Sequence, residues 1–202
     1  MEQEYKWKLA DPQAGEGLLA AGLDRASSGA RETISMAATY YDTADRLLWS
    51  LHGGLRLRQE NGVSVCCLKL EVREEGGCTL REEFEAQAED IRQGVALLPA
   101  QGAPEALCRQ LLDRGLVELC TVDYTRRACL LRVEEDGRCC EAELTLDLGS
   151  ARRQGRSGAI CESEFEYKSG DPALFHAFAH RLEADYGLEP EPSSKLARAM
   201  AL

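Results

Sequence analysis

Carboxylate side chains recur at alternate positions in four segments of the sequence. The pairs are Glu2/Glu4, Glu83/Glu85, Glu141/Glu143 and Glu162/Glu164. In an extended strand, residues i and i+2 lie on one face, so each pair places two negative charges close together. Such charges repel unless a cation lies between them, and oxygen clusters suit hard divalent cations such as Mg²⁺ or Mn²⁺. The pattern therefore favours a divalent metal site.

Arginine and lysine side chains alternate in the same way in other segments. Arg56 and Arg58 alternate with leucines, and Lys69 is flanked by Leu68 and Leu70. Basic clusters bind phosphate, and arginine often does so through two parallel hydrogen bonds. A solvated polar face would explain any single strand. The set as a whole favours a barrel whose acidic and basic walls face inward around a polyphosphate with its metal ions.

The elements that must position these side chains are mostly strands. We expect strands at 2–10, 34–41, 55–59, 63–72, 78–87, 117–133, 138–148 and 159–168, and helices at 12–25, 90–98, 104–114 and from Asp171-Pro172 to about 186. Asn61-Gly62 and Asp136-Gly137 are typical of tight hairpin turns. Seven or eight hairpin-linked strands with a few helices predict an α+β protein whose antiparallel sheet is closed or strongly curled.

The length of 202 residues suits one ordinary folded domain or two very small ones. The chain is 44% hydrophobic and 29% charged, which excludes a disordered chain, a collagen-like fibre and a coiled coil. Its net charge of −11 disfavours nucleic acid and anionic membranes as partners. No apolar run approaches the roughly 20 residues that cross a bilayer, and the N-terminus lacks an apolar signal region. A soluble, cytoplasmic protein is expected.

Other residues with chemical potential have simpler interpretations. The nine cysteines are expected to be reduced core thiols, because their number is odd and C-x-x-C spacing is absent. His176 and His180 are four residues apart on an expected helix but lack a third metal ligand. Trp7 and Trp49 are expected to be core or packing aromatics rather than base-stacking groups, and Ser27-Ser28 to be polar loop residues without a histidine partner.

Several segments, in order along the chain, resemble the CYTH superfamily, the triphosphate tunnel metalloenzymes. They are the opening E-x-E-x-K, YYDTADRLLWSLHGGLRLR at 40–58, CLKL at 67–70, REEFE at 81–85, ELTLD at 143–147, CESEFEYKSGDP at 161–172 and SSKLARAMAL at 193–202. The last two resemble the inorganic triphosphatase branch, with Ala199 where a glycine is common. The opening motif alone is weak evidence, whereas ordered segments over residues 2–198 are strong.

The resemblance implies one CYTH domain over residues 1–202: an eight-stranded antiparallel β-barrel, or triphosphate tunnel, with surrounding helices. It implies two divalent metals, Mg²⁺ or Mn²⁺, held by Glu2, Glu4, Asp147, Glu162 and Glu164. The implied phosphate-binding residues are Lys6, Arg56, Arg58, Lys69 and Lys195, with Arg126 and Arg127 competing for one further position. Arg127 is favoured from its spacing after Thr125. Glu2, Glu4 and Lys6 are the implied catalytic residues, and Glu83 and Glu85 are expected to support the site by binding metal or by orienting Arg and Lys.

The activity that follows is hydrolysis of a triphosphate, with inorganic triphosphate cleaved to pyrophosphate and phosphate as the first choice. Thiamine triphosphatase and class IV adenylate cyclase are the alternatives within the family. A non-catalytic polyphosphate-binding module is the alternative of another class, disfavoured because all five implied metal ligands are present. The arginines and lysines would bind the triphosphate, while metal ions and carboxylates would activate a water molecule for attack on it.

The C-terminal tail is the last expected part of the site. It follows a Glu-Pro-Glu-Pro stretch that cannot be helix or central strand. A frayed terminus is one interpretation; the other is a tail that carries Lys195 to a tunnel mouth and becomes ordered on ligand binding. The sequence leaves the oligomeric state open, a homodimer included.

Overall fold

The computed structural model describes the backbone of residues 1–202 and the side chains of residues 1–26, 30–70 and 73–202. The expectation that Ser27 and Ser28 are loop residues is wrong, because the strand Ser27–Asp42 begins there. The strand expected at 63–72 continues to Glu75.

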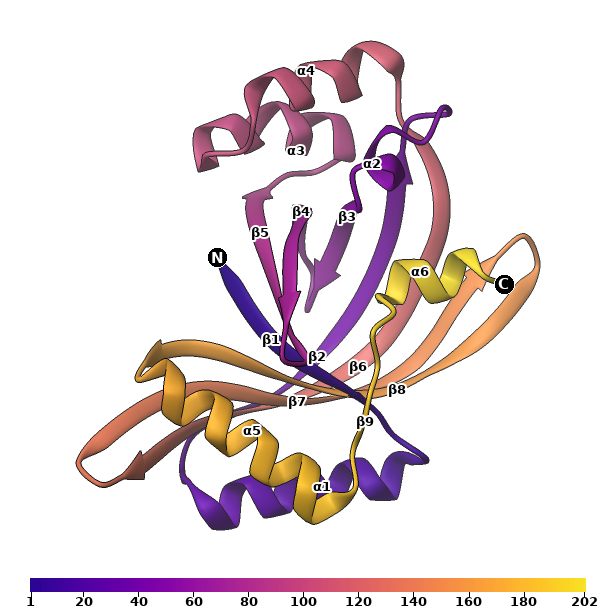
Figure 1. Cartoon of the computed structure of the whole chain (residues 1–202). Coiled ribbons are helices and arrows are strands. Elements are labelled where there is room, and N and C mark those ends of the chain that lie inside the picture. Colours follow the sequence, from indigo (N-terminus) through magenta and orange to yellow (C-terminus); the bar gives the residue numbers. More distant parts are fainter.

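The described backbone forms one antiparallel sheet that closes on itself (Figure 1). Its strands are β1 (Glu2–Lys8), β2 (Ser27–Asp42), β3 (Gly53–Glu60), β4 (Val63–Glu75), β5 (Cys78–Gln87), β6 (Val117–Glu135), β7 (Arg138–Arg153), β8 (Arg156–Gly170) and β9 (Glu189–Pro190). They lie in the order β5-β4-β3-β2-β6-β7-β8-β1-β9, and pairing of β1 with β5 closes the barrel. The expected eight-stranded barrel is confirmed. The short strand β9 pairs with β1 as a ninth strand of the sheet.

Helices cover the barrel on three sides. They are α1 (Pro12–Arg25), α2 (Leu47–Ser50), α3 (Ile91–Leu97), α4 (Glu105–Arg114), α5 (Pro172–Tyr186) and α6 (Lys195–Met200), with a 3₁₀ turn at Leu98–Gln101. In Figure 1, α1 and α5 lie side by side beneath β7 and β8, whereas α3 and α4 stand beyond the ends of β4 and β5. The yellow C-terminal helix, α6, packs against β6, β7 and β8.

Local sequence explains where the longer helices begin and end. Asp11 accepts a hydrogen bond from the Ala14 amide at 2.9 Å, and Asp171 accepts one from the Leu174 amide at 3.0 Å. A proline follows each of these N-caps, where its missing N–H costs nothing. Gly187 ends α5 with a left-handed φ of 59°. The helices expected at 12–25 and 172–186 therefore have the predicted bounds.

The hairpin turns follow from residues that tolerate a left-handed backbone. Asn61-Gly62 has φ values of 48° and 92°, and Asp136-Gly137 has values of 51° and 75°. Two consecutive positive φ values match the twist of the flanking strands. Gln154-Gly155 repeats this geometry between β7 and β8, with φ values of 50° and 78°. Glutamine carries little turn signal, so this third hairpin was not predicted.

The connection between β2 and β3 is organised by one buried carboxylate. Asp42 Oδ1 accepts hydrogen bonds from the Thr43 amide at 2.7 Å and the Leu48 amide at 2.9 Å. Its Oδ2 accepts one from the Trp49 amide at 3.0 Å. The turn expected at Asp42-Thr43 is thus the anchor of α2, and it leads the chain back into β3.

The apolar faces of the strands point outward, against the helices. The largest cluster of buried apolar side chains includes Trp7 and Phe165 from the barrel and Phe175 from α5. Trp7 is fully buried, as expected, and its indole N–H donates to Glu183 Oε1 at 2.8 Å. Trp49 is not a core residue: it is 45% exposed, because the short α2 turns it away from the core. With the apolar faces outside, the polar faces of the strands line the interior.

All nine cysteines are free thiols, as expected, and seven of them are buried. Burial raises the pKa of Cys66 to about 12 and that of Cys120 to about 11. We therefore predict that a disulfide reagent such as DTNB at pH 8 reacts fastest with Cys139 and more slowly with Cys161, whose pKa is also raised by burial. Unfolding in guanidinium should release all nine. Rapid reaction of most thiols in the native protein would contradict this packing.

None of the described helices combines the length and the apolar character that a bilayer crossing requires.

Candidate active site inside the barrel

A cavity of about 370 Å³ occupies the barrel interior, and each of the eight barrel strands contributes to its wall. Among the described side chains, eight carboxylates and eight basic groups line it. They are Glu2, Glu4, Glu60, Glu83, Glu85, Glu143, Glu164 and Glu166, and Lys6, Arg56, Arg58, Lys69, Arg81, Arg126, Lys168 and Lys195. The alternating charges of the sequence thus face inward, and a merely solvated polar surface does not explain them.

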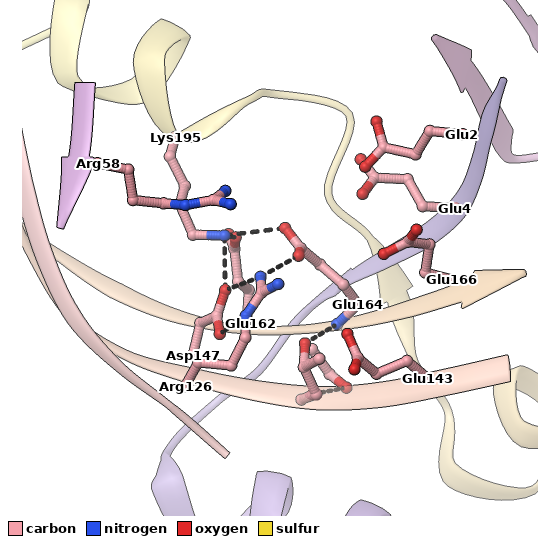
Figure 2. A network of polar contacts seen from close by, with 12 residues as sticks. Glu2, Glu4, Arg58, Arg126, Glu143, Asp147, Glu162, Glu164, Glu166 and Lys195 are labelled. Atoms are coloured by element: carbon pink, nitrogen blue, oxygen red, sulfur yellow. Dashed lines mark hydrogen bonds and ion pairs between the residues drawn. The ribbon is translucent and has the colours of Figure 1, made fainter. Parts of the chain in front are cut away.

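The first carboxylate pair projects from β1 into this cavity (Figure 2). Glu2 Oε1 accepts a hydrogen bond from Lys69 Nζ at 2.7 Å, and Glu4 pairs with Arg81. Burial raises the pKa of Glu2 to about 7, although the neighbouring Lys69 opposes the shift. Glu2 Oε2 is buried and accepts no hydrogen bond from any described residue. A cation bound in the cavity would give this oxygen a positively charged partner.

Lys6, the third residue of the opening motif, is buried beside the first carboxylate pair. It forms no ion pair within 4.0 Å with a described residue. Burial lowers its pKa, because an ammonium group without a close partner loses its hydration. An anion in the cavity would supply that partner.

The second carboxylate group lies at the junction of β7 and β8. Asp147, Glu162 and Glu164 each offer an oxygen atom, and these atoms lie within 4.8 Å of one another. The side chains of Asp147 and Glu162 are 0% exposed. Three carboxylates so close together in a buried place require positive charge among them.

Two cations from different elements meet this group (Figure 2). Arg126 donates to Asp147 through Nε at 2.8 Å and Nη2 at 2.7 Å, and it also pairs with Glu164. Lys195 Nζ lies 2.7 Å from Asp147 Oδ2 and 2.8 Å from Glu164 Oε1, and it pairs with Glu162. Burial alone would raise the pKa of Glu164, but Lys195 and Arg126 outweigh it and hold this pKa well below its usual range.

The basic side chains of β3 retain donors for a ligand. Arg58 Nη2 lies 3.1 Å from Glu85 Oε1, and Arg56 Nη2 lies 3.9 Å from Glu83 Oε1. The Nε atoms of both arginines are buried and donate no hydrogen bond to any described residue. Buried donors without partners are costly, and phosphate oxygens satisfy arginine in bidentate geometry. The two arginines are thus prepared for an anion, and Glu83 and Glu85 form ion pairs with basic groups of the cavity.

The acidic groups fit a hard divalent cation. The buried, unpartnered Glu2 Oε2 and the cluster of Asp147, Glu162 and Glu164 supply oxygen ligands that Mg²⁺ and Mn²⁺ prefer. Cys67 forms a further group with Glu83 and Glu85. Its thiol donates to Glu83 at 3.0 Å, and burial raises its pKa to about 12, so it stays protonated. The carboxylate groups are therefore the better candidates for a metal.

The preference for Arg127 is wrong. Arg126 lies directly opposite Asp147 in the β6–β7 pairing, and residues opposite each other share a face of the sheet. The register is continuous from Thr121 to Glu135, so Arg127 faces outward, where it pairs with Glu16 of α1. Spacing after Thr125 could not show whether Arg126 or Arg127 faces the cavity. The residue opposite each arginine on β7 decides which of the two does.

Sequence reasoning missed two cations that hold the carboxylates. Arg81 pairs with Glu4, and Arg198 pairs with Glu162. Arg81 alternates with Glu83 along β5, and this spacing placed it on the same face. Arg198 follows Lys195 by three residues, which is one turn of α6, so both reach the same side. Each residue was part of a recognised segment, but neither was assigned a role.

The tail is an ordered part of the site. Ser194 caps α6 by accepting a hydrogen bond from the Ala197 amide at 3.0 Å, and Leu196 and Ala199 are buried. The side chain of Lys195 is only 6% exposed. Contacts within the chain therefore hold the tail against the barrel and carry Lys195 to the cavity, while ordering of the tail by a ligand stays a prediction.

Comparisons with known proteins agree with this geometry. Residues 1–200 match the model of the CYTH domain. The chain belongs to the CYTH family. Among solved structures with the same fold is a Hippeastrum protein described as a candidate adenylyl cyclase with a dominant triphosphatase activity. It is 20% identical, with a TM-score of 0.63 over 100% of this chain and 96% of that one.

Two further structures share the CYTH fold. The PH1819 protein of Pyrococcus horikoshii is 17% identical, with a TM-score of 0.59, covering 100% of this chain and 99% of that one. A candidate adenylate cyclase from Vibrio parahaemolyticus is 16% identical, with a TM-score of 0.52, covering 96% of this chain and 94% of that one. At these identities, the likeness concerns the fold.

Proposed function

We propose that this CYTH protein hydrolyses a triphosphate with Mg²⁺ or Mn²⁺, and that inorganic triphosphate is cleaved to pyrophosphate and phosphate. The observation that carries the proposal is the cavity itself. Eight carboxylates and eight basic groups among the described side chains share about 370 Å³, a size within the range of small-molecule sites. The family match and the triphosphatase activity of the Hippeastrum neighbour support the same class of substrate.

The charge balance of the cavity favours a metal–triphosphate complex as the true substrate. The whole chain carries a net charge of −11, yet the acidic and basic side chains that line the cavity are equal in number. Free triphosphate alone would add negative charge to this balanced cavity, and free divalent cations alone would add positive charge. Together the two ligands offset part of each other's charge, and each finds complementary groups on the wall.

The residues divide into two sets. Glu2, Glu4, Asp147, Glu162 and Glu164 would hold the metal, and Lys6, Arg56, Arg58, Lys69, Arg126 and Lys195 would bind the phosphates. When bound, a divalent metal polarises a phosphoryl oxygen and neutralises charge. The arginines and lysines fix the triphosphate along the barrel and stabilise the charge that develops on its oxygens. A cavity carboxylate takes the proton of the attacking water.

A phosphate-release panel tests this function. Tripolyphosphate, thiamine triphosphate, ATP and longer polyphosphate are each incubated with Mg²⁺ or Mn²⁺, and with EDTA as the control. We expect the fastest release from tripolyphosphate, equal amounts of phosphate and pyrophosphate, and none in EDTA. Faster phosphate release from thiamine triphosphate would indicate a thiamine triphosphatase. Formation of cyclic AMP from ATP would indicate an adenylate cyclase. Tight binding of tripolyphosphate without turnover would indicate a binding module.

The neighbouring arginines of β6 provide a matched pair for this assay. We predict that Arg126→Ala lowers kcat/KM for tripolyphosphate by about 100-fold or more, because it removes a buried cation that contacts Asp147 and Glu164. Arg127→Ala should leave it within about twofold, because an exposed ion pair contributes little. A larger loss in Arg127→Ala than in Arg126→Ala would reverse the assignment of the two faces.

A further inference from the structure

The ammonium group of Lys195 occupies the place among Asp147, Glu162 and Glu164 that suits a divalent cation. It contacts one oxygen of each carboxylate: Asp147 Oδ2 at 2.7 Å, Glu164 Oε1 at 2.8 Å, and Glu162 Oε1. Figure 2 shows Lys195 reaching these three side chains from α6. The same carboxylates form the described group whose oxygens lie within 4.8 Å of one another.

A metal ion and this ammonium group compete for the same oxygen atoms. Arg126 uses Asp147 Oδ1 and Oδ2 together with Glu164 Oε2, and Arg198 uses Glu162 Oε2. A divalent cation needs lone pairs on two or more of these carboxylates and repels a positive charge placed beside it. Of the three cations, Lys195 is the one that bridges all three carboxylates, so a metal at this group must displace it.

Lys195 can leave its carboxylates while α6 stays in place. Its flexible four-carbon stem starts at the first residue of the helix, and Ser194, Lys195 and Leu196 all border the cavity. The rest of the tail is anchored elsewhere: Arg153 donates to the Met200 carbonyl at 3.1 Å, and Leu196 and Ala199 are buried. The Nζ atom can therefore turn from the β7–β8 junction toward the cavity by side-chain rotation.

We propose that Lys195 is an exchangeable internal counter-cation, which neutralises Asp147, Glu162 and Glu164 until a metal binds them and which then turns to the phosphate chain. The contact of the released Lys195 with phosphates rests on the proposed function. The displacement of Lys195 by a metal concerns metal binding alone. The exchange makes metal and triphosphate binding cooperative, because the metal releases a cation that the phosphates need. It also keeps the carboxylate cluster neutralised in the metal-free protein.

Calorimetric titration with Mn²⁺ alone, without triphosphate, tests the exchange. Lys195→Met should bind Mn²⁺ at least about tenfold more tightly than the wild type, since the competing cation is gone. Lys168→Met is the matched control, because Lys168 lies in the same cavity but pairs with Glu143 and Glu166. Its Mn²⁺ affinity should change by less than about threefold. Mn²⁺ should also raise the melting temperature of Lys195→Met more than that of the wild type.

Chemical labelling provides a second test that needs no variant. Acetic anhydride should modify Lys195 slowly in EDTA and faster with saturating Mn²⁺, as followed by peptide mass spectrometry. Unchanged or weaker Mn²⁺ binding in Lys195→Met would overturn the proposal. If that variant does not fold, unchanged labelling of Lys195 would overturn it. Neither readout uses turnover, so a wild-type protein that shows the exchange but releases no phosphate would refute only the proposed function.

Discussion

Replacing Glu2 or Glu164 by glutamine is expected to slow triphosphate hydrolysis severely, while the two variants change stability in opposite directions. Each substitution removes a negative charge and an oxygen ligand from a metal-binding group, so we expect kcat to fall by about 100- to 1000-fold. The loss should persist at saturating Mg²⁺ or Mn²⁺ and at high tripolyphosphate concentrations. Phosphate release under these conditions measures it.

The opposite stability effects follow from the two pKa shifts. Burial raises the pKa of Glu2 to about 7, so its ionisation opposes folding increasingly as the pH rises from about 4.5 to 7. The pKa of Glu164 is held well below its usual range by Lys195 and Arg126, so its ionisation stabilises the fold above pH 4.5 and this stabilisation is lost in acid. In EDTA at pH 8, Glu2→Gln should melt at or above the wild-type temperature, and Glu164→Gln below it.

Thermal melts of the two variants at pH 4 and pH 8 separate these effects from activity. The difference in melting temperature between wild type and Glu164→Gln should be almost as large at pH 4 as at pH 8 and should shrink only in stronger acid, because the pKa of Glu164 lies well below 4.5. If Glu164→Gln is as stable as the wild type at pH 8, Lys195 and Arg126 do not hold Glu164 as the structure shows. If either variant keeps full metal-dependent turnover, the carboxylate that it replaces is not a metal ligand.

The second large effect is expected at the basic wall. Arg56→Ala removes a buried guanidinium whose Nε has no hydrogen-bond partner among the described residues. A desolvated, charge-assisted contact to a ligand contributes about 2–5 kcal/mol when one partner is removed, or roughly 30- to 5000-fold in kcat/KM. The melting temperature should change little, because Glu83, which loses Arg56 as a partner, still pairs with Lys69. Lys69 Nζ lies 3.2 Å from Glu83 Oε1.

The control for Arg56→Ala is Arg109→Ala on α4, where the arginine forms an exposed pair with Glu105. The two substitutions remove the same charge from the chain, so a general electrostatic effect would appear in both. Steady-state kinetics with tripolyphosphate should show a loss only for Arg56→Ala. An unchanged kcat and KM in that variant would exclude the arginine from phosphate binding.

Local sequence signals predicted the elements well where a single residue type decides the geometry. Asp11 and Asp171 each begin a helix, and Asn61-Gly62 turns a hairpin, because these residues fix caps and positive φ angles by themselves. The inward-facing charges were also predictable, since alternation along a strand defines two faces. The resemblance to the CYTH family then indicated which face was inside.

Features set by distant partners were not predictable in the same way. Arg126 faces the cavity because it lies opposite Asp147 across the β6–β7 pair, a register that spans 21 residues of sequence. The contact of Lys195 with Asp147 depends on how α6 packs against β6, β7 and β8. Trp49 is exposed because Asp42 anchors the short α2. In each case, tertiary contacts outweigh the local pattern.

The proposed function requires the barrel interior to hold a metal–triphosphate complex, with the metal at carboxylates and the phosphates at arginines and lysines of the cavity. Anomalous X-ray scattering from crystals grown with Mn²⁺ and a non-hydrolysable imido analogue of triphosphate tests it most directly. We predict manganese peaks at carboxylates among Glu2, Glu4, Asp147, Glu162 and Glu164, with phosphate density against Arg56, Arg58 and Lys69. Manganese and phosphate bound only outside the barrel, with the cavity residues still paired to one another, would contradict the account.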